Sequence, residues 1–392
     1  MLNPINLTKS NNTNMKPNRT IEISILNAEL SKFGLKVNRI VEGVSVVKFQ
    51  VRIYPDTPIK KVKNLEYGVA LNKPNVTVKQ NENNPAILEI SMPQEERKTF
   101  TMGDLYSPQF VNNGRNKLLM MIGKEQDGGK VYKDLASSPH MMVSGITGSG
   151  KSVFLHQVIC SLLMNHNDDV EYYGIDTKRT ELNQYEALNN FHYIDEAWEA
   201  NRVLAGLCQE MDRRYEVLHN AGVRDISNYN GNMKRIVVII DEYADLTTDD
   251  LKKPVNASVL RLAQKARACG IHLIIATQHP KSNIIATEIK DNFPVRVALK
   301  VYDHNQSKVA INKTGAENLL GQGDMLFDPH NPKKPGLMRI QAAKVETSDI
   351  QYIVNLAIQQ QQQRVEREKK EGFWGKVRRK ANEFFNQNEA YC

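Results

Sequence analysis

The sequence predicts an α/β protein whose main domain has a parallel β-sheet covered by helices. Short apolar segments alternate with longer amphipathic segments between residues 117 and 345. This alternation is typical of parallel sheets, in which each strand is followed by a helix. Residues before 113 contain β-branched segments without the same alternation, so they predict a separate, small α+β domain.

The composition limits the classes of protein that fit. The chain has 392 residues with a formal net charge of +8, and at about 150 residues per domain this length suggests two or three domains. No apolar run approaches the roughly 18 residues that cross a bilayer, and the polar, Asn-rich start lacks the apolar core of a signal peptide. We therefore expect a cytoplasmic protein. Its positive charge fits a polyanionic partner and a solvated basic surface equally well.

Cysteines and histidines give no sign of a metal centre. The four cysteines are far apart and form no CxxC pair, which predicts reduced core thiols rather than zinc ligands or disulfides. His140 and His272 lie in apolar runs, so we expect both to be packed in the core.

The sequence of the first part of the chain indicates a scaffold. We expect residues 1–20 to be disordered and residues 21–112 to form the small α+β domain. Its predicted strands are residues 46–53, 75–80 and 86–92, and residues 62–72 have helical spacing. No metal, nucleophile or phosphate motif occurs there, which suggests a collar.

Residues 113–355 form the predicted main domain. Its strand candidates are residues 140–145, 170–176, 235–241, 271–277 and 295–301. Residues 196–219 predict a long helix with one apolar, core-facing side. In sheets of this kind, ligands bind at the carboxyl ends of the strands.

A phosphate-binding loop follows the first of these strands. The stretch GITGSGKS fits G-x-x-x-x-G-K-[ST], with a strand before it and a helix after it, and consists of Gly145, Ile146, Thr147, Gly148, Ser149, Gly150, Lys151 and Ser152. Backbone N–H groups of such a loop surround phosphates, and the helix N-terminus adds positive charge. Lys151 would reach the β- and γ-phosphates, and Ser152 would ligate Mg²⁺. The flanking elements argue against a chance glycine-rich turn.

Two further strand ends indicate hydrolysis and not only binding. In the stretch RIVVIIDEYADL, a buried-type strand ends in Asp241 and Glu242, and carboxylates are rarely buried without a partner. Asp241 would hold Mg²⁺ through water, and Glu242 would polarise the attacking water. The stretch IIATQHP places Gln278 at another strand end, where its amide could sense the γ-phosphate.

The segment RLAQKARACGIHL contains Arg261, Lys265 and Arg267. Spacing alone allows two interpretations. The helix presents a solvated basic face, or it provides an arginine finger to the ATP of a neighbouring subunit.

Several of these stretches together resemble the FtsK/SpoIIIE family of DNA translocases. They include GITGSGKS, EMDRRYEVLHNAGVRDISNYN, IIDEYADL, RLAQKARACGIHLIIATQHP and GAENLLGQGDML, and residues 43–72 resemble the family's α domain. The resemblance implies a RecA-like P-loop NTPase domain that uses ATP and Mg²⁺ and forms a homo-hexameric ring around double-stranded DNA. It implies that Arg267 acts in trans and that Lys290 and Lys308, with Lys281 as a weaker candidate, lie near DNA phosphates.

The sequence departs from the family pattern at three places. His279 replaces a usual arginine after the ATQ motif, Gln306-Ser307-Lys308 replaces DSR, and Asp176-Thr177-Lys178 replaces DPK. We expect these differences to affect how strongly the protein holds DNA and the geometry of its steps along DNA, but not ATP hydrolysis.

We see no membrane helices, long Pro/Gln-rich linker or winged-helix domain, so we expect a DNA pump of a plasmid or conjugative element. A relaxase or a transfer-channel protein is a candidate partner. Two other functions stay open: a secretion-type ATPase that docks or moves protein, and a non-motor nucleotide switch. Glu242, Gln278 and Arg267 argue against the switch, and Lys290 and Lys308 favour DNA.

Residues 356–392 form a basic tail. On a helical wheel, one face collects Phe373, Trp374, Val377, Ala381, Phe384 and Phe385, and the basic residues around it are Lys376, Arg378, Arg379 and Lys380. Three interpretations stay open for this helix. It packs back on the motor, or its charges only keep it soluble, or residues 373–385 form a peripheral anchor on anionic lipid at the inner face of the cell membrane.

Overall fold

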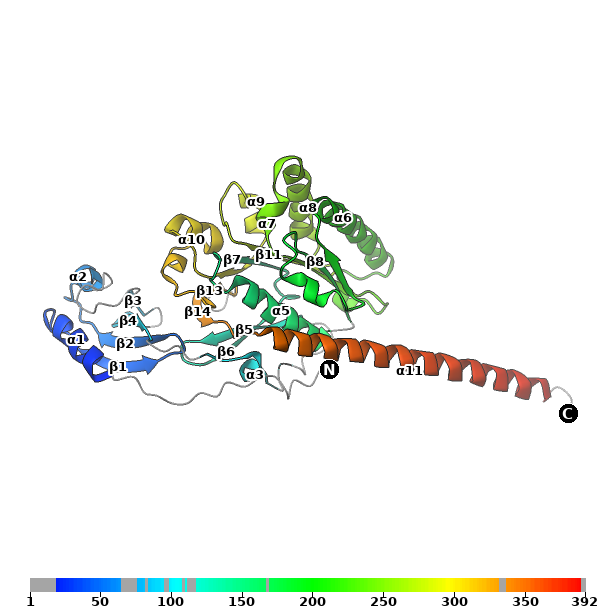
Figure 1. Cartoon of the computed structure of the whole chain (residues 1–392), viewed down its shortest axis with the longest axis horizontal. Helices are drawn as coiled ribbons and strands as arrows, with labels where there is room; N and C mark the ends of the chain where they lie inside the picture. The colour runs from blue at the N-terminus through cyan, green and yellow to red at the C-terminus, as the bar shows by residue number, and fades with distance from the viewer. Residues whose placement is uncertain are drawn as a thin grey trace.

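The computed structural model describes residues 19–64, 76–81, 84–94, 99–107, 110, 118–166, 169–330 and 336–388, the last eighteen of them by backbone alone. Two sheets organise this part of the chain, one of four strands and one of ten. Figure 1 shows the small sheet beside the large one, with the long C-terminal helix leaving on the other side.

The small sheet is antiparallel, with strand order β1-β2-β4-β3. Its elements are α1 (Arg19–Ser31), β1 (Val37–Glu42), β2 (Val46–Arg52), α2 (Ile59–Lys63), β3 (Thr77–Gln80) and β4 (Ile87–Pro93). The three predicted strands are confirmed, whereas α1 and β1 were not predicted. The helix expected over residues 62–72 lies mostly outside the described residues, as do residues 1–18 of the segment expected to be disordered.

Polar contacts join the small sheet to the loop between β5 and β6. The Gln126 side chain is buried, and its Oε1 accepts a hydrogen bond from the backbone N–H of Ser45 at 3.2 Å. Its Nε2 donates to Ser45 Oγ at 3.0 Å. The predicted collar is therefore held on the main domain by a buried amide.

The large sheet has the order β6-β5-β14-β13-β12-β7-β11-β10-β8-β9. Its strands are β5 (Leu119–Glu125), β6 (Lys130–Asp134), β7 (His140–Ser144), β8 (Val170–Ile175), β9 (Phe191–Ile194), β10 (Arg235–Ile240), β11 (Ile271–Thr277), β12 (Val295–Ala298), β13 (Asp324–Asp328) and β14 (Met338–Gln341). The five predicted strands are confirmed, and with β9 they form the parallel half. The predicted parallel sheet is therefore confirmed in this half, and β13, β14, β5 and β6 extend it in antiparallel fashion. The short turn between β5 and β6 allows only antiparallel pairing of these two strands.

Helices cover both faces of the parallel half. α5 (Lys151–His166) packs on one face, while α6 (Ala197–Asn220) and α8 (Lys252–Lys265) pack on the other. Along β10, Val237 and Ile239 belong to the core on the side of α5. Ile236, Val238 and Ile240 belong to the core on the side of α6 and α8. Such two-sided burial explains why these strands are continuous apolar runs. The helix predicted over residues 196–219 is α6.

The shorter elements connect these layers. They are α3 (Met102–Leu105), α7 (Tyr243–Leu246), α9 (Thr287–Asp291), α10 (His304–Ile311) and the 3₁₀ turns η2 (Leu182–Tyr185), η3 (Ile226–Asn228), η4 (Asp249–Leu251) and η5 (Ala316–Asn318).

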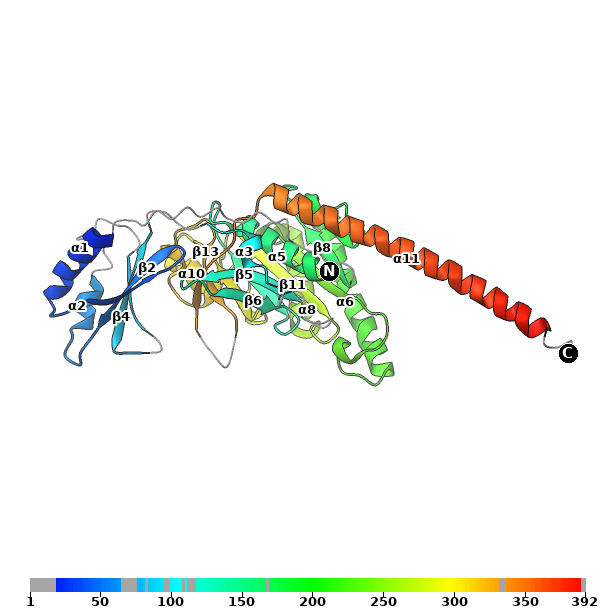
Figure 2. The same ribbon diagram turned by 90° about the horizontal axis from the view of Figure 1, so that it is seen from below.

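The C-terminal helix α11 (Thr347–Asn388) has 42 residues, which corresponds to a length of about 63 Å. Its first turns pack beside α5 through Ile350, Ile353 and Ala357, and the rest projects away (Figure 2). The helix is continuous across the boundary that we expected at residue 356. In the described part of the chain, no helix is long and apolar enough to cross a membrane.

Candidate nucleotide site

The predicted phosphate-binding loop connects the carboxyl end of β7 to the first turn of α5. Gly148 and Gly150 have positive φ angles of 75° and 100°, which favour glycine. A Cβ at Gly150 would stand 2.6 Å from the backbone nitrogen of Gly323, and the Gly323 N–H donates to Ser149 O at 2.8 Å. The turn before β13 therefore packs against the loop and fixes its shape.

Lys151 and Asp241 form a buried ion pair. Lys151 Nζ lies 2.8 Å from Asp241 Oδ1 and also donates to the Asp241 carbonyl at 2.6 Å. Each side chain is only 4% exposed. Burial raises the pKa of Asp241, and the nearby Lys151 charge opposes this rise. The lysine and the acid predicted for phosphate and metal are thus adjacent at the edge where β7 and β10 end.

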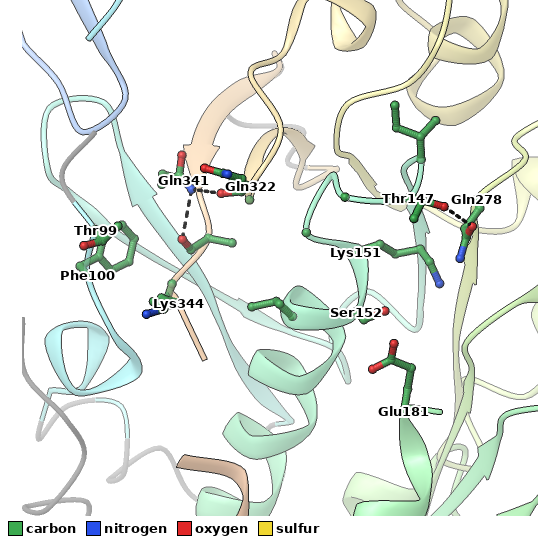
Figure 3. Close-up of a pocket in the computed structure, with 17 residues that line it drawn as sticks. Thr99, Phe100, Thr147, Lys151, Ser152, Glu181, Gln278, Gln322, Gln341 and Lys344 are labelled. Atoms are coloured by element: carbon green, nitrogen blue, oxygen red, sulfur yellow. Dashed lines mark hydrogen bonds between the residues drawn. The ribbon is translucent and has the colours of Figure 1, made fainter. Parts of the chain in front are cut away.

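Glu242 and Gln278 also lie at this edge. The Glu242 side chain is 2% exposed and accepts hydrogen bonds from Thr277 Oγ1 at 2.7 Å and from the backbone N–H of Gln278 at 2.9 Å. The Gln278 side chain in turn accepts a hydrogen bond from Thr147 Oγ1 at 2.9 Å, as Figure 3 shows. The structure therefore connects the ends of β10 and β11 to the phosphate-binding loop.

A cavity of about 660 Å³ opens over the phosphate-binding loop and Gln278, and its volume is within the range of small-ligand pockets. One side is formed by the loop, Glu181 and Gln278, and the other by Thr99, Phe100, Gln322, Gly323, Gln341, Ala342, Ala343 and Lys344 (Figure 3). Sequence reasoning missed the second side and Glu181. A weak signal existed for part of it, because residues 321–323 belong to the stretch GAENLLGQGDML.

The donor atoms at the loop suit Mg²⁺. Ser152 and Asp241 offer only oxygen, which is the ligand atom that this hard cation prefers. In the parts of the chain that the structure describes, no cluster of three or more His, Cys, Asp or Glu residues could hold a metal by itself. A cation at this site would therefore depend on phosphate oxygens and water for its other ligands.

Arg267 lies at the amino ends of the parallel strands, on the edge of the sheet opposite to the phosphate-binding loop. It is exposed, follows the last turn of α8 and stands four residues before β11 begins. It borders a hollow together with Ser138, Arg296 and Asp291. The length of the intervening strands separates it from its own phosphate-binding loop by about 20 Å. Arg261, by contrast, pairs with Asp212 at 2.8 Å.

The three lysines proposed near DNA do not form one cluster. Lys281 and Lys308 are exposed and follow the carboxyl ends of β11 and β12. Lys290 is half-buried in α9 near the amino end of β12, where its carbonyl accepts a hydrogen bond from Arg296 Nη2 at 2.7 Å.

The packed residues agree with the sequence analysis. His140 and His272 are fully buried. Cys160, Cys208 and Cys269 are buried free thiols, and Cys392 lies outside the described residues.

Comparison with known proteins identifies the family. Residues 102–236 and 233–282 match the model of the FtsK/SpoIIIE family. The DNA translocase FtsK of Streptococcus pneumoniae is 34% identical over 354 residues, which cover 85% of this chain and 46% of that protein. The DNA translocase FtsK of Caldanaerobacter subterraneus is 34% identical over 338 residues, covering 83% and 47%. The chain thus spans about half the length of these curated relatives.

Solved structures agree on the fold. The pCW3 conjugation coupling protein TcpA, solved as a monomer with ATPγS, aligns with a TM-score of 0.60 at 24% identity, covering 88% of this chain and 99% of TcpA. The cytoplasmic domain of the Type VII secretion ATPase EccC of Thermomonospora curvata aligns with a TM-score of 0.57 at 22% identity, covering 66% and 34%. Through the segment 102–282 and the P-loop fold around it, this chain belongs to the FtsK/SpoIIIE family.

Proposed function

We propose that this chain is an ATP-driven translocase of double-stranded DNA that works as a homo-hexameric ring in the transfer or maintenance of a plasmid or conjugative element. The observation that carries the proposal is the position of Arg267 on the edge opposite the phosphate-binding loop. An arginine that cannot reach its own nucleotide is suited to the nucleotide of the next subunit. Head-to-tail contacts of this kind close into rings.

In this mechanism each residue at the loop has one task. Lys151 leaves Asp241 and places its charge on the β- and γ-phosphates. Ser152 would ligate Mg²⁺, and Asp241 would hold it through water. When bound, Mg²⁺ neutralises charge that develops on the phosphates. Glu242 orients the attacking water and takes its proton.

Two side chains act on the transferred phosphoryl group. Gln278 contacts the γ-phosphate from the end of β11. Arg267 of the neighbouring subunit stabilises the charge of the transition state.

Support for DNA as the substrate comes from the charge and the relatives. The chain has a net charge of +8, and Lys281 and Lys308 are exposed. The relatives are named DNA translocases, and TcpA is named a conjugation coupling protein. In the proposed ring these lysines and Lys290 contact DNA phosphates, and the small sheet forms a collar on residues 113–355. A relaxase or a transfer-channel protein is the candidate partner.

The test is the ATPase rate of the full chain with and without linear duplex DNA. A translocase should be stimulated by the duplex, whereas a secretion-type ATPase or a nucleotide switch should show no response. Arg267→Ala should abolish the stimulated rate, and Arg261→Ala, which removes a surface ion pair, should preserve it. Full activity of Arg267→Ala would refute the trans role.

The tail provides a second, separable proposal. We infer that residues 373–385 contact anionic lipid, which would place the motor peripherally at the inner face of the membrane. The backbone of α11 supports this by carrying these residues away from the motor (Figure 2). Flotation with anionic liposomes should recover the full chain but not a version ending at Glu371. Equal recovery of the two, or recovery that salt does not reduce, would eliminate lipid binding.

A further inference from the structure

A line of hydrogen bonds leads from the core to the phosphate-binding loop. Ser152, His156 and Cys160 are four residues apart and share one face of α5, while Glu181 and Tyr185 are four residues apart at η2. His156 Nε2 lies 3.1 Å from Glu181 Oε2, and His156 Nδ1 lies 2.9 Å from the Tyr185 hydroxyl. Cys160 Sγ lies 3.7 Å from the same hydroxyl.

The chemistry of the groups sets the direction of these bonds. An ionised carboxylate can only accept, so His156 Nε2 carries the proton that Glu181 receives. In the tautomer with its single proton on Nε2, the imidazole accepts at Nδ1 from the Tyr185 hydroxyl. Burial raises the pKa of Cys160 to about 12, so this residue is a thiol that donates to Tyr185. With this tautomer, every bond points toward Glu181.

The Glu181 carboxylate faces the loop. Figure 3 shows it directed at Ser152 across the floor of the cavity. The pKa of Glu181 is lowered, first by its hydrogen bond with His156 and then by one from Ser152 and by the Lys151 charge. Its backbone is fixed as well, because Asp176 Oδ2 accepts the N–H groups of residues 180, 181 and 182 at 3.0, 2.7 and 3.0 Å.

We propose that Glu181 is a positioning residue for Mg²⁺. It accepts a hydrogen bond from the Ser152 hydroxyl and thereby turns a lone pair of Ser152 Oγ toward the cation, while His156 and Tyr185 hold the carboxylate in place. A serine hydroxyl has one proton and two lone pairs, so committing the proton to Glu181 leaves the oxygen free to ligate. The inference rests on the nucleotide binding in the proposed function, and it concerns neither DNA nor the ring.

The test measures binding rather than turnover. The full-length chain is titrated with fluorescent ATPγS at increasing MgCl₂, and again in EDTA. Glu181→Ala should raise the Mg²⁺ concentration for half-maximal effect about 10-fold or more, the usual loss for groups that orient a metal ligand, and leave binding in EDTA unchanged. Glu181→Gln, whose amide oxygen still accepts, should show a smaller shift. His156→Phe, which keeps an aromatic ring, should shift the curve in the direction of Glu181→Ala.

The control is Glu186→Ala, which removes an exposed carboxylate from the same segment and should leave both curves unchanged. An unchanged Mg²⁺ dependence in a folded Glu181→Ala variant overturns the proposal, and if that variant does not fold, an unchanged dependence in His156→Phe overturns it. Equal losses with Mg²⁺ and in EDTA also overturn it, because they indicate a merely structural role. If the unsubstituted chain binds no nucleotide, the proposed function fails instead.

Discussion

The substitution Glu242→Gln separates nucleotide binding from hydrolysis. Glu242 Oε1 accepts from Thr277 Oγ1 at 2.7 Å and from the N–H of Ala244 at 3.4 Å, and Oε2 accepts from the N–H of Gln278 at 2.9 Å. A carboxylate has about four lone-pair positions, and three are used by these bonds. Lys178 Nζ lies 3.8 Å from Oε2, so a water molecule at the fourth position would lie beside this lysine. Glutamine preserves the shape but replaces one acceptor oxygen with a donor.

Two magnitudes follow from this geometry. Loss of a general base lowers the rate about 10²- to 10⁴-fold, which corresponds to about 3–5 kcal/mol in the barrier. The new NH₂ group must also face a backbone N–H, of either Ala244 or Gln278, and an unsatisfied group of this kind costs about 1–3 kcal/mol of stability. We therefore expect a slow enzyme that is slightly less stable.

Three measurements on one preparation check this expectation. ATPγS affinity should stay within a few-fold of the unsubstituted chain, since Lys151 and the loop are intact. Steady-state ATPase with duplex DNA should fall at least 100-fold by the rule for general bases, and urea unfolding should show the modest loss of stability. Turnover near the original rate would refute the role of Glu242 as the base.

The remaining predictions concern three other parts of the molecule. Lys151→Ala should abolish ATP binding and reduce the free energy of unfolding by about 3–5 kcal/mol, because it leaves the Asp241 carboxylate buried without its partner; nucleotide titration and urea unfolding measure the two effects, and tight ATP binding would contradict the phosphate role. Neutralising Lys290 and Lys308 should reduce the slope of log affinity for duplex DNA against log salt by about 1.8, or 0.9 for each contact, equally for all DNA sequences, and a sequence-dependent loss would instead indicate base readout. Burial lowers the pKa of His140 to about 3 and that of His272 well below its ordinary value, whereas the unfolded chain takes up protons near pH 6.5, so stability is present above this pH and is lost as the pH falls. The pair should contribute a loss of about 2–3 kcal/mol between pH 7 and 5.5. Unfolding at the two pH values measures this loss, and equal midpoints would contradict it.

The sequence predicted the elements whose signal is local. The strands β7, β10 and β11 are buried on both faces, so each is a continuous apolar run that can be recognised without its neighbours. The loop that follows β7 needs glycine at fixed positions, and Lys151 and Ser152 complete its pattern. The acids after β10 and the glutamine after β11 could be assigned to the same edge because parallel strands end together.

The antiparallel strands and the far side of the cavity could not be predicted. Asp324 and Arg339 are charged residues within β13 and β14, so neither segment has the continuous apolar pattern of a buried strand. In the structure, Arg339 Nη2 pairs with Asp324 Oδ2 at 2.7 Å across these two strands. Glu181 follows a strand by several residues, and only the fold brings its carboxylate to Ser152. Phe100 reaches the cavity from the segment before β5, where no periodicity marks it.

The pairing of β5 with β14 has a consequence for how the domain is made. These are the first and last strands of the large sheet in chain order, yet they are neighbours, and the turn that rests on Gly150 comes just before β13. Contacts between such distant segments slow folding. During synthesis, the loop emerges from the ribosome long before the strands that enclose it, and the cavity wall at residues 341–344 emerges last. The nascent chain therefore carries the complete motif for nucleotide binding well before it has a nucleotide pocket, and a protein interrupted before Met338 would be unable to form one.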